Sequence, residues 1–398
     1  MLHSIIDDEN LAQQGAEKMP WFRACMPILR KLNNEFIETK PFSNLVIAVC
    51  FHLEPKTAFW MESMLAGGAE HIYIVGNLGT TKPETAAYLA SLDRVTVLGK
   101  KADSMEEHQS YLDQVLSQKI DLFLDNGASL ILAYHRNNPK WIPKGATEET
   151  RSGKLLIENE QIDPKFPVIV VDDSPVKWQL ENAIGVGQSV VDGFMRATSL
   201  LIGGKNILII GYGHCGSGVT EKFRAMGANT MVYDVDPVLL LKARADGNRV
   251  GELNDLLECA DVIVTVTGRF NVITHQHINI IKNGAILANA GHYGFEIDRL
   301  GILTHATSYS SIRPGIEEIV FDSKKIYLLE KANPLNLSAA DGNPIEIMDI
   351  GLGLQAACAR KLAIEATSLR HGLQHVPEDI NRNVSRISLD SQSAGIFQ

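Results

Sequence analysis

The feature that most constrains this chain is a glycine-rich turn between a buried strand and a helix. Gly211, Gly213 and Gly216 have the spacing G-x-G-x-x-G, and the apolar run Asn206–Gly213 leads into them. A helical pattern, Val219–Met226, follows. The first glycine permits a tight turn, the second lets the backbone approach a pyrophosphate, and the third lets helix and strand pack closely. This setting predicts a dinucleotide site with the pyrophosphate at the helix N-terminus.

An acidic residue after the next strand indicates which dinucleotide is bound. Asp234 lies 23 residues after Gly211, at the end of the next apolar run. A carboxylate there accepts hydrogen bonds from the adenosine ribose hydroxyls and repels a 2′-phosphate. Val235 and Asp236 follow, with no arginine to receive that phosphate. We therefore expect residues 205–292 to form a Rossmann-type domain that binds NAD in preference to NADP, and we disfavour a glycine-rich turn without a ligand.

Strand and helix patterns alternate along the chain and form two sets. Helix-like stretches such as Lys56–Gly67 and Met105–Gln118 separate short apolar runs that are typical of buried parallel strands. The runs are Asn44–His52, His71–Asn77, Ile120–Gly127 and Pro167–Asp173 in the first set, and Asn206–Gly213, Thr230–Asp236, Val262–Gly268 and Ala285–Gly291 in the second. Helical patterns also cover Gly187–Gly203 and Ile345–Ala366. The sequence therefore predicts an α/β protein with two doubly wound Rossmann-like domains.

Composition and charge argue against several classes of partner and site. The net charge of -10 disfavours nucleic acid, because phosphate binding needs a basic surface. No apolar run approaches the ~18 residues of a membrane span, and the acidic N-terminus lacks the apolar core of a secretory signal. The five cysteines lie far apart without metal or redox spacing, so we expect free thiols and no metal site. We expect a cytoplasmic protein.

Beyond the glycine motif, several segments resemble one known family. Gly204–Val250 resembles the NAD domain of the adenosylhomocysteinase (S-adenosyl-L-homocysteine hydrolase) family, and Ser174–Ser199 resembles its substrate loop and linker helix. The other similar segments, in chain order, are Leu11–Pro20, Cys50–Glu70, Phe123–Leu130, Thr147–Gly153, Ala288–Ile297 and Pro334–Leu337. Because unrelated motifs occur in the family's order as far as about Leu389, the resemblance is specific.

The resemblance implies a domain arrangement and a reaction. It implies a substrate-binding domain at 1–186, an inserted NAD-binding domain at 187–340, and C-terminal helices at 341–398 that return to the substrate domain. The family forms homo-oligomers, so we expect a dimer or tetramer whose small-molecule partner is a nucleoside. In the family, NAD oxidises the ribose 3′-hydroxyl, the ketone acidifies the C4′ proton, and the 5′ thiol leaves. Water then adds and the ketone is reduced again.

The family positions for 3′ oxidation fall on a lysine and two polar residues that follow it. Lys177 matches the lysine that takes the 3′-hydroxyl proton, a role that needs a pKa lowered by burial or by a neighbouring cation. Glu181 matches an aspartate that binds the ribose hydroxyls, and Asn182 matches an asparagine beside the nicotinamide. Without the resemblance, Lys177 and Glu181 would suggest an exposed i,i+4 helix pair worth about 0.3–0.5 kcal/mol.

Other positions match family contacts to the ribose, the leaving group and the cofactor. Glu149 and Thr150 match a segment that contacts ribose and cofactor, although Glu148 and Glu149 alone would suggest a solvated acidic pair. His52, at a strand end, matches the histidine that serves the 5′ leaving group, whereas a lone histidine there is more often structural. The resemblance also implies cofactor contacts at Thr267, Gly268, Asn289 and Asn336, and a substrate contact from His292 beside Gly291 in the loop around the nicotinamide.

Several positions depart from the family pattern. Asn126 replaces an aspartate that partners the histidine in proton transfer, and an amide cannot exchange a proton as a carboxyl group does. Asn343 replaces a histidine that helps to hold adenine, Glu54 replaces a threonine that contacts adenine, and Lys56 stands where an acid or amide does so. Val186 replaces a cysteine or threonine near the nicotinamide. The family's final Lys/Tyr segment, which closes over a neighbouring subunit's NAD, is missing from the shortened tail, so we expect NAD to exchange more readily.

These departures leave three functions open. The first is a hydrolase of the adenosylhomocysteinase type with a shifted pocket, which cleaves S-adenosylhomocysteine or a related 5′-thionucleoside. The second is an NAD-dependent nucleoside or sugar 3′-oxidoreductase or epimerase without hydrolysis, which Asn126 and the altered base pocket favour. The third is a non-catalytic NAD-binding regulator, against which Lys177 argues because a pure binder does not need that base. We rank them in that order, with the first two close together.

Overall fold

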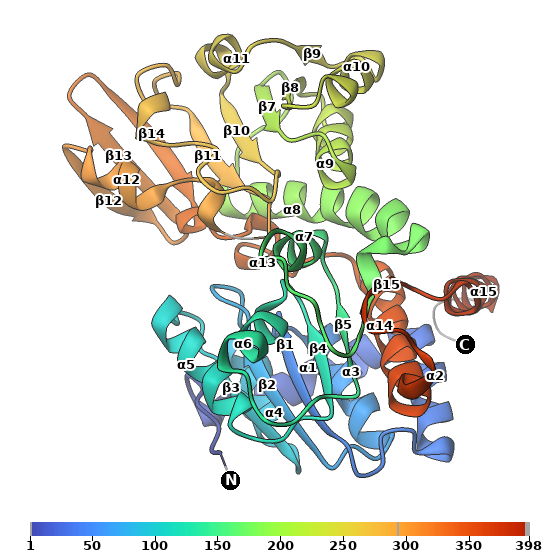
Figure 1. Cartoon of the computed structure of the whole chain (residues 1–398). Helices are drawn as coiled ribbons and strands as arrows, with labels where there is room; N and C mark the ends of the chain where they lie inside the picture. The colour runs from blue at the N-terminus through green and yellow to red at the C-terminus, as the bar shows by residue number, and fades with distance from the viewer. Residues whose placement is uncertain (1, 293, 395–398) are drawn as a thin grey trace. The chain divides into compact units, whose positions relative to one another are not determined.

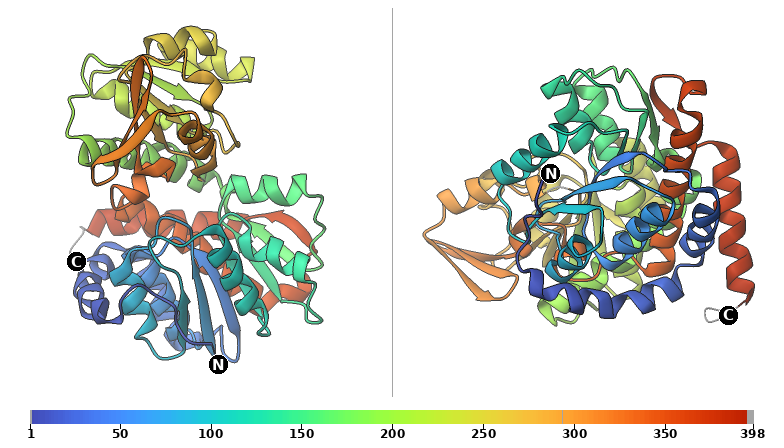
Figure 2. Two further views of the ribbon diagram at one scale, coloured as in Figure 1. Left: turned by 90° about the vertical axis from the view of Figure 1, so that its left-hand side faces the viewer. Right: turned by 90° about the horizontal axis from the view of Figure 1, so that it is seen from below.

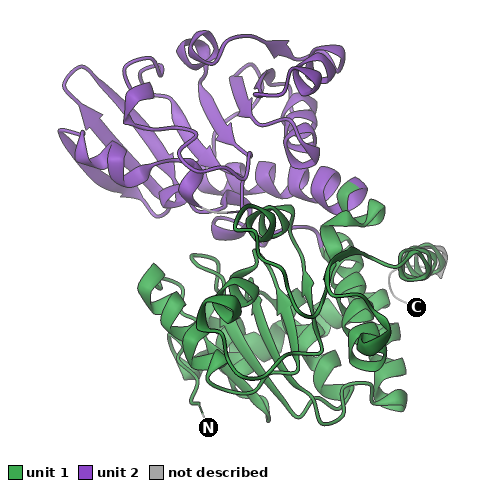
Figure 3. Ribbon diagram, in the orientation of Figure 1, with its two compact units in different colours: residues 1–178, 345–398 green, residues 179–344 purple. Residues whose placement is uncertain are grey.

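The computed structural model describes residues 2–292 and 294–394, and the chain divides into two compact units (Figure 3). Unit 1 combines Met1–Trp178 with Ile345–Gln398, and unit 2 is Gln179–Pro344. The chain therefore changes units at 178/179 and at 344/345, whereas the sequence placed the boundaries at 186/187 and 340/341. The last four residues, on which part of the shortened-tail expectation rests, lie outside the described residues.

Unit 1 is built on a seven-stranded sheet in which every neighbouring pair is parallel (Figure 1). Its strands are β1 (Val46–Phe51), β2 (His71–Gly76), β3 (Val95–Leu98), β4 (Leu122–Asp125), β5 (Gly145–Glu148), β6 (Pro167–Val170) and β15 (Gly372–His375). The order β15-β6-β5-β4-β1-β2-β3 reverses direction between β1 and β4. In doubly wound sheets, ligands bind beyond the carboxyl ends of the strands at this reversal.

The helices of unit 1 bury both faces of that sheet. They are η1 (Glu9–Leu11), α1 (Ala12–Cys25), α2 (Pro27–Thr39), α3 (Pro55–Ala66), α4 (Pro83–Ala90), α5 (Met105–Leu116), α6 (Ser129–Asn137), α7 (Arg151–Asn159), η2 (Val171–Asp173), α14 (Ile345–Glu365), η7 (Ala366–Ser368) and α15 (Glu378–Ala394). Helix α14 is apolar on almost all sides and packs against α2, α3 and β5 (Figure 2). The C-terminal segment thereby completes the core of unit 1, although it is far in sequence from the elements against which it packs.

Unit 2 contains an eight-stranded sheet with the order β12-β13-β14-β11-β10-β7-β8-β9. Its strands are β7 (Asn206–Ile210), β8 (Asn229–Tyr233), β9 (Arg249–Val250), β10 (Val262–Thr265), β11 (Ile286–Asn289), β12 (Ser308–Arg313), β13 (Ile316–Phe321) and β14 (Lys324–Leu329). The six strands from β14 to β9 are parallel and β12–β13 are antiparallel. The parallel part again reverses its order, between β7 and β10.

The helices of unit 2 begin with a segment that crosses the boundary between the units. The π-helix η3 (Lys177–Gly185) starts on the last residues of unit 1 and continues into α8 (Val186–Thr198). The remaining helices are α9 (His214–Ala225), α10 (Pro237–Ala245), α11 (Leu253–Cys259), η4 (His275–His277), η5 (Gly294–Glu296), α12 (Arg299–Thr304), η6 (Glu330–Ala332) and α13 (Leu335–Ser338). The described residues contain no helix that is long and apolar enough to cross a membrane.

The predicted fold class is confirmed, and the differences lie at polar or short strands. β5, with the sequence GATE, is polar yet fully buried, and Gly145 starts it because a Cβ there would lie 2.6 Å from the Leu362 side chain. In the hairpin β12–β13, the edge strand β12 is exposed along its whole length, so no apolar alternation marked it. The short strand β15 forms beside β6 before α15 begins, and no apolar run marked it in the sequence.

A buried carboxylate on α14 links the C-terminal segment to α2. Asp349 accepts hydrogen bonds from the backbone N–H groups of Ile28 (2.7 Å) and Leu29 (2.9 Å), the first turn of α2. Burial raises the pKa of Asp349 from 3.8 to about 7. Between these two values the folded state holds a proton that the unfolded chain releases, so stability falls as the pH rises through that window.

We predict that Asp349→Asn removes this part of the pH dependence of stability, because the asparagine amide does not titrate in this pH range. The measurement is the midpoint of thermal unfolding at several pH values between roughly 4 and 8. The wild-type midpoint should fall relative to that of the variant as the pH rises, and the exposed Asp93→Asn control should run parallel to wild type. Parallel curves for wild type and Asp349→Asn would refute the prediction.

Candidate functional site

The predicted site residues gather at the carboxyl edges of the two sheets. In unit 1, His52 follows β1 and Asn126 follows β4, the two strands that flank the reversal in strand order. In unit 2, Gly211 follows β7 and Thr267 lies just beyond β10, at the corresponding reversal. Each unit therefore presents its predicted residues where a doubly wound sheet binds ligands.

The glycine turn of unit 2 has the geometry that a pyrophosphate needs. Gly211 has φ +102°, and a Cβ there would lie 2.7 Å from the Val266 carbonyl oxygen. A Cβ on Gly216 would lie 2.0 Å from the Gly211 carbonyl oxygen, so this glycine lets α9 approach β7. A Cβ on Gly213, the N-cap of α9, would meet no atom within 4 Å. The turn thus leaves space at the N-terminus of α9, where backbone N–H groups and the helix dipole favour an anion.

Asp234 is fixed at the end of β8 by two backbone hydrogen bonds. Its carboxylate accepts from the N–H of Tyr212 (2.6 Å), inside the glycine turn, and from the N–H of Asp236 (2.9 Å). The acid is therefore tied to the turn that would hold the pyrophosphate, as ribose recognition requires. The geometry fits a dinucleotide without a 2′-phosphate.

A buried glutamate that the sequence analysis missed holds the loop after β10. Glu296 accepts hydrogen bonds from the Thr267 N–H (2.9 Å), the Thr267 hydroxyl (3.0 Å) and the Gly268 N–H (2.7 Å). Burial raises its pKa, while these bonds oppose the shift. A Cβ at Gly291 would lie 1.7 Å from a Glu296 oxygen, which explains the glycine. The sequence signal that could have revealed Glu296 was an acidic residue within the otherwise apolar segment GFEI.

Three of the predicted asparagines of unit 2 belong to two separate hydrogen-bonded groups, one of which lies at the end of β11. Asn289 donates to the Ala332 carbonyl (2.9 Å) and accepts from the Gly291 N–H (2.8 Å). A separate chain joins Asn336 to the Ser189 hydroxyl (3.3 Å) and that hydroxyl to Asn343 Oδ1 (2.8 Å). Asn182 is buried and His292 is half-buried in the same unit.

In unit 1, Lys177 is buried between two carboxylates. Its Nζ lies 3.1 Å from Glu149 Oε1 and 3.9 Å from Asp172 Oδ1, and the side chain of Gln355 donates to Glu149. Lys177 is 3% exposed and Glu181 is 6% exposed. The exposed helix-pair interpretation of these two residues is therefore wrong, as is the solvated acidic pair at positions 148 and 149, because both glutamates are buried.

Buried carboxylates also shape the loop that carries Asn126. Glu148 accepts from the N–H groups of Gly127 (2.9 Å) and Ala128 (2.8 Å) and from the Thr150 hydroxyl (2.7 Å). Asp125, opposite Glu148 in the sheet, accepts from Asn126 N–H (3.1 Å). Burial raises the pKa of both carboxyl groups. Thr150 caps α7 with the same hydroxyl, so its predicted cofactor contact would come from a residue that is already anchored.

Three polar residues that the sequence analysis missed surround His52 and Asn126. His52 Nδ1 lies 2.8 Å from the Thr80 hydroxyl, and that hydroxyl lies 3.0 Å from the Asn77 carbonyl. Asn77 Nδ2 lies 3.0 Å from Asn126 Oδ1, and the Cys50 thiol lies 3.1 Å from Asn77 Oδ1. Asn77 and Thr80 directly follow β2, and this position was the signal available in the sequence.

Glu54 and Lys56 form a buried ion pair at the start of α3. Lys56 Nζ lies 2.8 Å from Glu54 Oε2, and the two residues are 2% and 5% exposed. A buried ion pair is costly to desolvate and contributes little net stability, so a need for specificity is one reason to keep it. The pair follows His52 within a few residues at the carboxyl end of β1.

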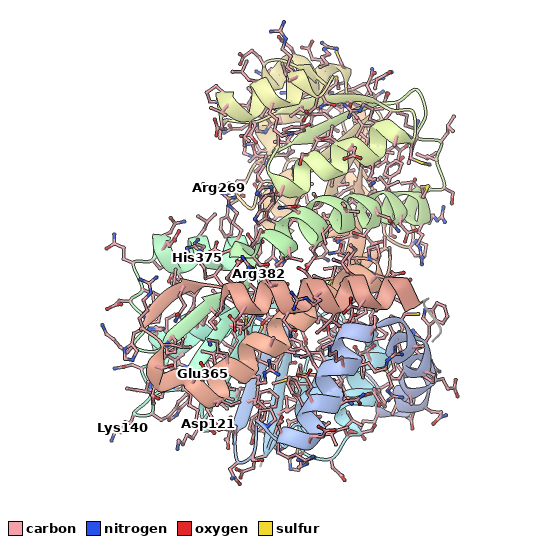
Figure 4. The ribbon with its side chains drawn as sticks, turned by 90° about the vertical axis from the view of Figure 1, so that its right-hand side faces the viewer. Asp121, Lys140, Arg269, Glu365, His375 and Arg382 are labelled. Atoms are coloured by element: carbon pink, nitrogen blue, oxygen red, sulfur yellow. The ribbon has the colours of Figure 1, made fainter. Side chains whose placement is uncertain are left out.

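A cavity of about 380 Å³ lies elsewhere in unit 1, along α15. Pro175 and Val176 form one wall, and residues of α15 form the other. Arg382, one of these α15 residues, is labelled in Figure 4. It contains none of the predicted site residues. Among the described residues, no group of three or more histidine, cysteine, aspartate or glutamate side chains is arranged to hold a metal ion.

Comparison with known proteins identifies similar sequences along nearly the whole chain. The family described as "S-adenosyl-L-homocysteine hydrolase, NAD binding domain" matches residues 182–342, which include the glycine turn and Asp234. NAD is therefore the cofactor. The chain is 38% identical over 392 residues to the S-inosyl-L-homocysteine hydrolase of Methanopyrus kandleri, covering 97% of this chain and 92% of the relative. It is 36% identical over 396 residues to the adenosylhomocysteinase of Pyrococcus abyssi (98% and 94% covered).

We predict that Asp234→Ala weakens NAD binding by about 10- to 100-fold and narrows the difference between NAD and NADP, because hydrogen bonds to a charged acceptor are worth about 1.5–3 kcal/mol. Asp234→Asn should retain an acceptor for the Tyr212 N–H while removing the charge that repels a 2′-phosphate. Titration calorimetry with both dinucleotides measures the two affinities. Equal binding of NAD and NADP by the wild type would refute the role of Asp234.

Proposed function

The chain belongs to the adenosylhomocysteinase family, and on that premise we propose that it hydrolyses the C5′ thioether of a purine nucleosyl-homocysteine through 3′ oxidation. The relatives described above are named as hydrolases of this kind, and the aligned regions cover more than nine-tenths of each chain. The observation within the molecule that carries the proposal is the burial of Lys177 between Glu149 and Asp172. A protein that only bound NAD would not need a buried cation there.

In the proposed reaction, the residues of unit 1 move protons at both ends of the ribose. NAD, when bound to the glycine turn of unit 2, supplies the redox chemistry at C3′. Lys177 accepts the proton of the 3′-hydroxyl, and Glu149 orients the ammonium group through their 3.1 Å contact. Glu181 accepts hydrogen bonds from the ribose hydroxyls. At the 5′ end, His52 exchanges protons with the departing sulfur and the arriving water.

The buried Glu54–Lys56 pair supports a 6-oxopurine, such as hypoxanthine, as the base. An ammonium group only donates hydrogen bonds and an ionised carboxylate only accepts them. In hypoxanthine the 6-oxygen accepts a hydrogen bond and N1–H donates one. The 6-oxygen therefore complements the ammonium group of Lys56, and N1–H complements the carboxylate of Glu54. In the family, the position of Lys56 carries an acid or amide that accepts from the 6-amino group of adenine. A lysine there replaces an acceptor with a donor, and a mispaired buried contact costs roughly 1–3 kcal/mol.

Asn126 favours a second candidate function, in which the enzyme oxidises C3′ but cleaves C5′ slowly or not at all. The amide cannot titrate, and general acid–base help is typically worth about 10²–10⁴-fold in rate. Elimination would therefore lag behind oxidation, and a 3′-keto nucleoside would accumulate. Asn126→Asp should accelerate thiol release if the hydrolase proposal holds. NADH without thiol in both forms would favour the oxidoreductase.

The direct test supplies the purified protein with S-inosylhomocysteine and S-adenosylhomocysteine and follows free thiol. Release of homocysteine from either compound supports the hydrolase. If neither compound releases thiol when NAD is present at a concentration that saturates the enzyme, the proposal is refuted. A faster reaction with the inosyl compound would support the 6-oxopurine assignment.

We predict that Lys177→Ala lowers the rate of NADH formation by about 10²–10⁴-fold, because it removes the base for the 3′-hydroxyl proton. NAD should remain bound, since most of its proposed contacts, including the glycine turn and Asp234, lie on unit 2. The matched control is Lys154→Ala, which removes a partly exposed lysine paired with Asp173 in the same unit. Stopped-flow absorbance of the reduced cofactor measures the rate, and an unchanged rate in Lys177→Ala would refute the assignment.

We predict that Lys56→Gln shifts the ratio of kcat/KM for inosyl over adenosyl substrate by about 10- to 100-fold toward adenosyl, because an amide can accept from the 6-amino group. The double variant E54Q/K56Q removes both buried charges and tests the same shift if Lys56→Gln folds poorly. Steady-state assays with both substrates give the ratio. A ratio that stays at the wild-type value in both variants would refute the role of the pair.

A further inference from the structure

The residues around His52 and Asn126 form one connected network whose hydrogen bonds can be assigned a direction. Asn77 lies at its centre. The backbone carbonyl of Asn77 serves the His52 side through Thr80, and its side chain serves the Asn126 side. Thr80, Asn77 and Asn126 are all buried, so these bonds are shielded from water.

The direction of the His52 branch follows from the single proton of a hydroxyl group. The Thr80 hydroxyl donates this proton to the Asn77 carbonyl, at 3.0 Å. It must therefore accept from His52 Nδ1, which lies 2.8 Å away. Nδ1 carries a proton in this arrangement, so the lone pair of the neutral His52 ring is on Nε2.

The direction of the Asn126 branch follows from the Cys50 thiol. Burial, with the nearby Asp125 charge, raises the pKa of Cys50 well above its ordinary value, so the thiol keeps its proton and donates to Asn77 Oδ1 at 3.1 Å. The Asn77 amide then directs Nδ2 to Asn126 Oδ1 at 3.0 Å. The Asn126 amide is thereby oriented with its oxygen toward Asn77 and its N–H₂ group turned away from it.

We infer that Thr80 and Asn77 are positioning residues for the 5′ chemistry: they hold His52 as the tautomer whose base is Nε2 and Asn126 as a hydrogen-bond donor. The inference rests on the proposed hydrolase function and identifies how the 5′ end works without a second titrating group. Thr80 acts on His52 directly, and Asn77 couples His52 to Asn126.

At the sulfur and at the water, the proton transfers need only this one acid–base group. When the C5′–S bond breaks, the sulfur keeps the electron pair of that bond and takes the Nε2 proton of the His52 imidazolium. The C4′ proton passes to the buried Lys177–Glu149 pair, and the electron pair that it leaves forms the C4′=C5′ bond. When water adds, its oxygen bonds to C5′ and Nε2 takes the released proton, while C4′ regains the electron pair and takes back a proton from the Lys177–Glu149 pair. The Asn126 N–H₂ group donates to the water oxygen or to the sulfur.

The test compares two substitutions at Thr80 with a matched control. Thr80→Val removes the acceptor for His52 Nδ1–H at nearly constant volume, and Thr80→Ser retains it. Thr81→Val is the control, because among the described residues the buried Thr81 hydroxyl has no hydrogen-bond partner. Single-turnover measurements follow reduced cofactor and free thiol together, with S-inosylhomocysteine as the probe.

We expect Thr80→Val to slow thiol release about tenfold or more, a part of the about 10²–10⁴-fold that acid–base help supplies. Reduced cofactor should form at the wild-type rate, and Thr80→Ser and Thr81→Val should release thiol within about threefold of wild type. An unchanged thiol rate in Thr80→Val, or equal losses in Thr80→Val and Thr80→Ser, would overturn the inference.

A spectroscopic measurement keeps the inference separate from the hydrolase proposal. In the ¹⁵N-histidine-labelled wild-type holoenzyme, long-range ¹H–¹⁵N spectra, assigned with His52→Asn, should show a neutral His52 ring protonated at Nδ1. Thr80→Val should lose that preference and Thr80→Ser should keep it. A ring protonated at Nε2 in the wild type would overturn the inference even if thiol is released. If no thiol is released from any substrate, the hydrolase proposal fails and the spectra still decide the tautomer.

Discussion

Buried carboxylates that accept backbone N–H groups hold the loops on which the whole candidate site depends. Glu148 binds the N–H groups of the loop after β4, and Glu296 binds those of the loop after β10. Asp234, which is half-buried, does the same for the glycine turn. A parallel sheet delivers its strands to one edge but does not fix the loops beyond it. Charge-assisted bonds to backbone amides, roughly twice as strong as neutral ones, fix these loops.

This arrangement separates scaffold from chemistry. At positions 148 and 149, adjacent glutamates have different partners: Glu148 binds backbone amides, whereas Glu149 pairs with Lys177. The same division recurs at positions 125 and 126, where Asp125 binds backbone amides and Asn126 belongs to the network around His52. Because side chains alternate along a strand end, neighbouring residues are directed to opposite tasks.

The sequence predicted the architecture well, because local signals encode it. Apolar runs bounded by glycine and polar residues marked most of the parallel strands, and the glycine spacing with Asp234 marked the dinucleotide turn. It did not predict Glu296 or the network of Asn77 and Thr80, because their partners are tens of residues away and only folding brings them together. Helical spacing alone would have suggested an exposed pair at Lys177 and Glu181, because spacing carries no information about what packs above the helix, and only the family resemblance pointed to a site there.

The central claim is that thioether cleavage proceeds through a nucleoside oxidised at C3′, and exchange of the C4′ hydrogen tests it most directly. A 3′-ketone makes that hydrogen acidic, whereas direct displacement at C5′ never touches it. We predict that the nucleoside recovered from a reaction in deuterium oxide carries deuterium at C4′, measured by mass spectrometry and NMR. Release of homocysteine together with a nucleoside that retains its original hydrogen at C4′ would contradict the account.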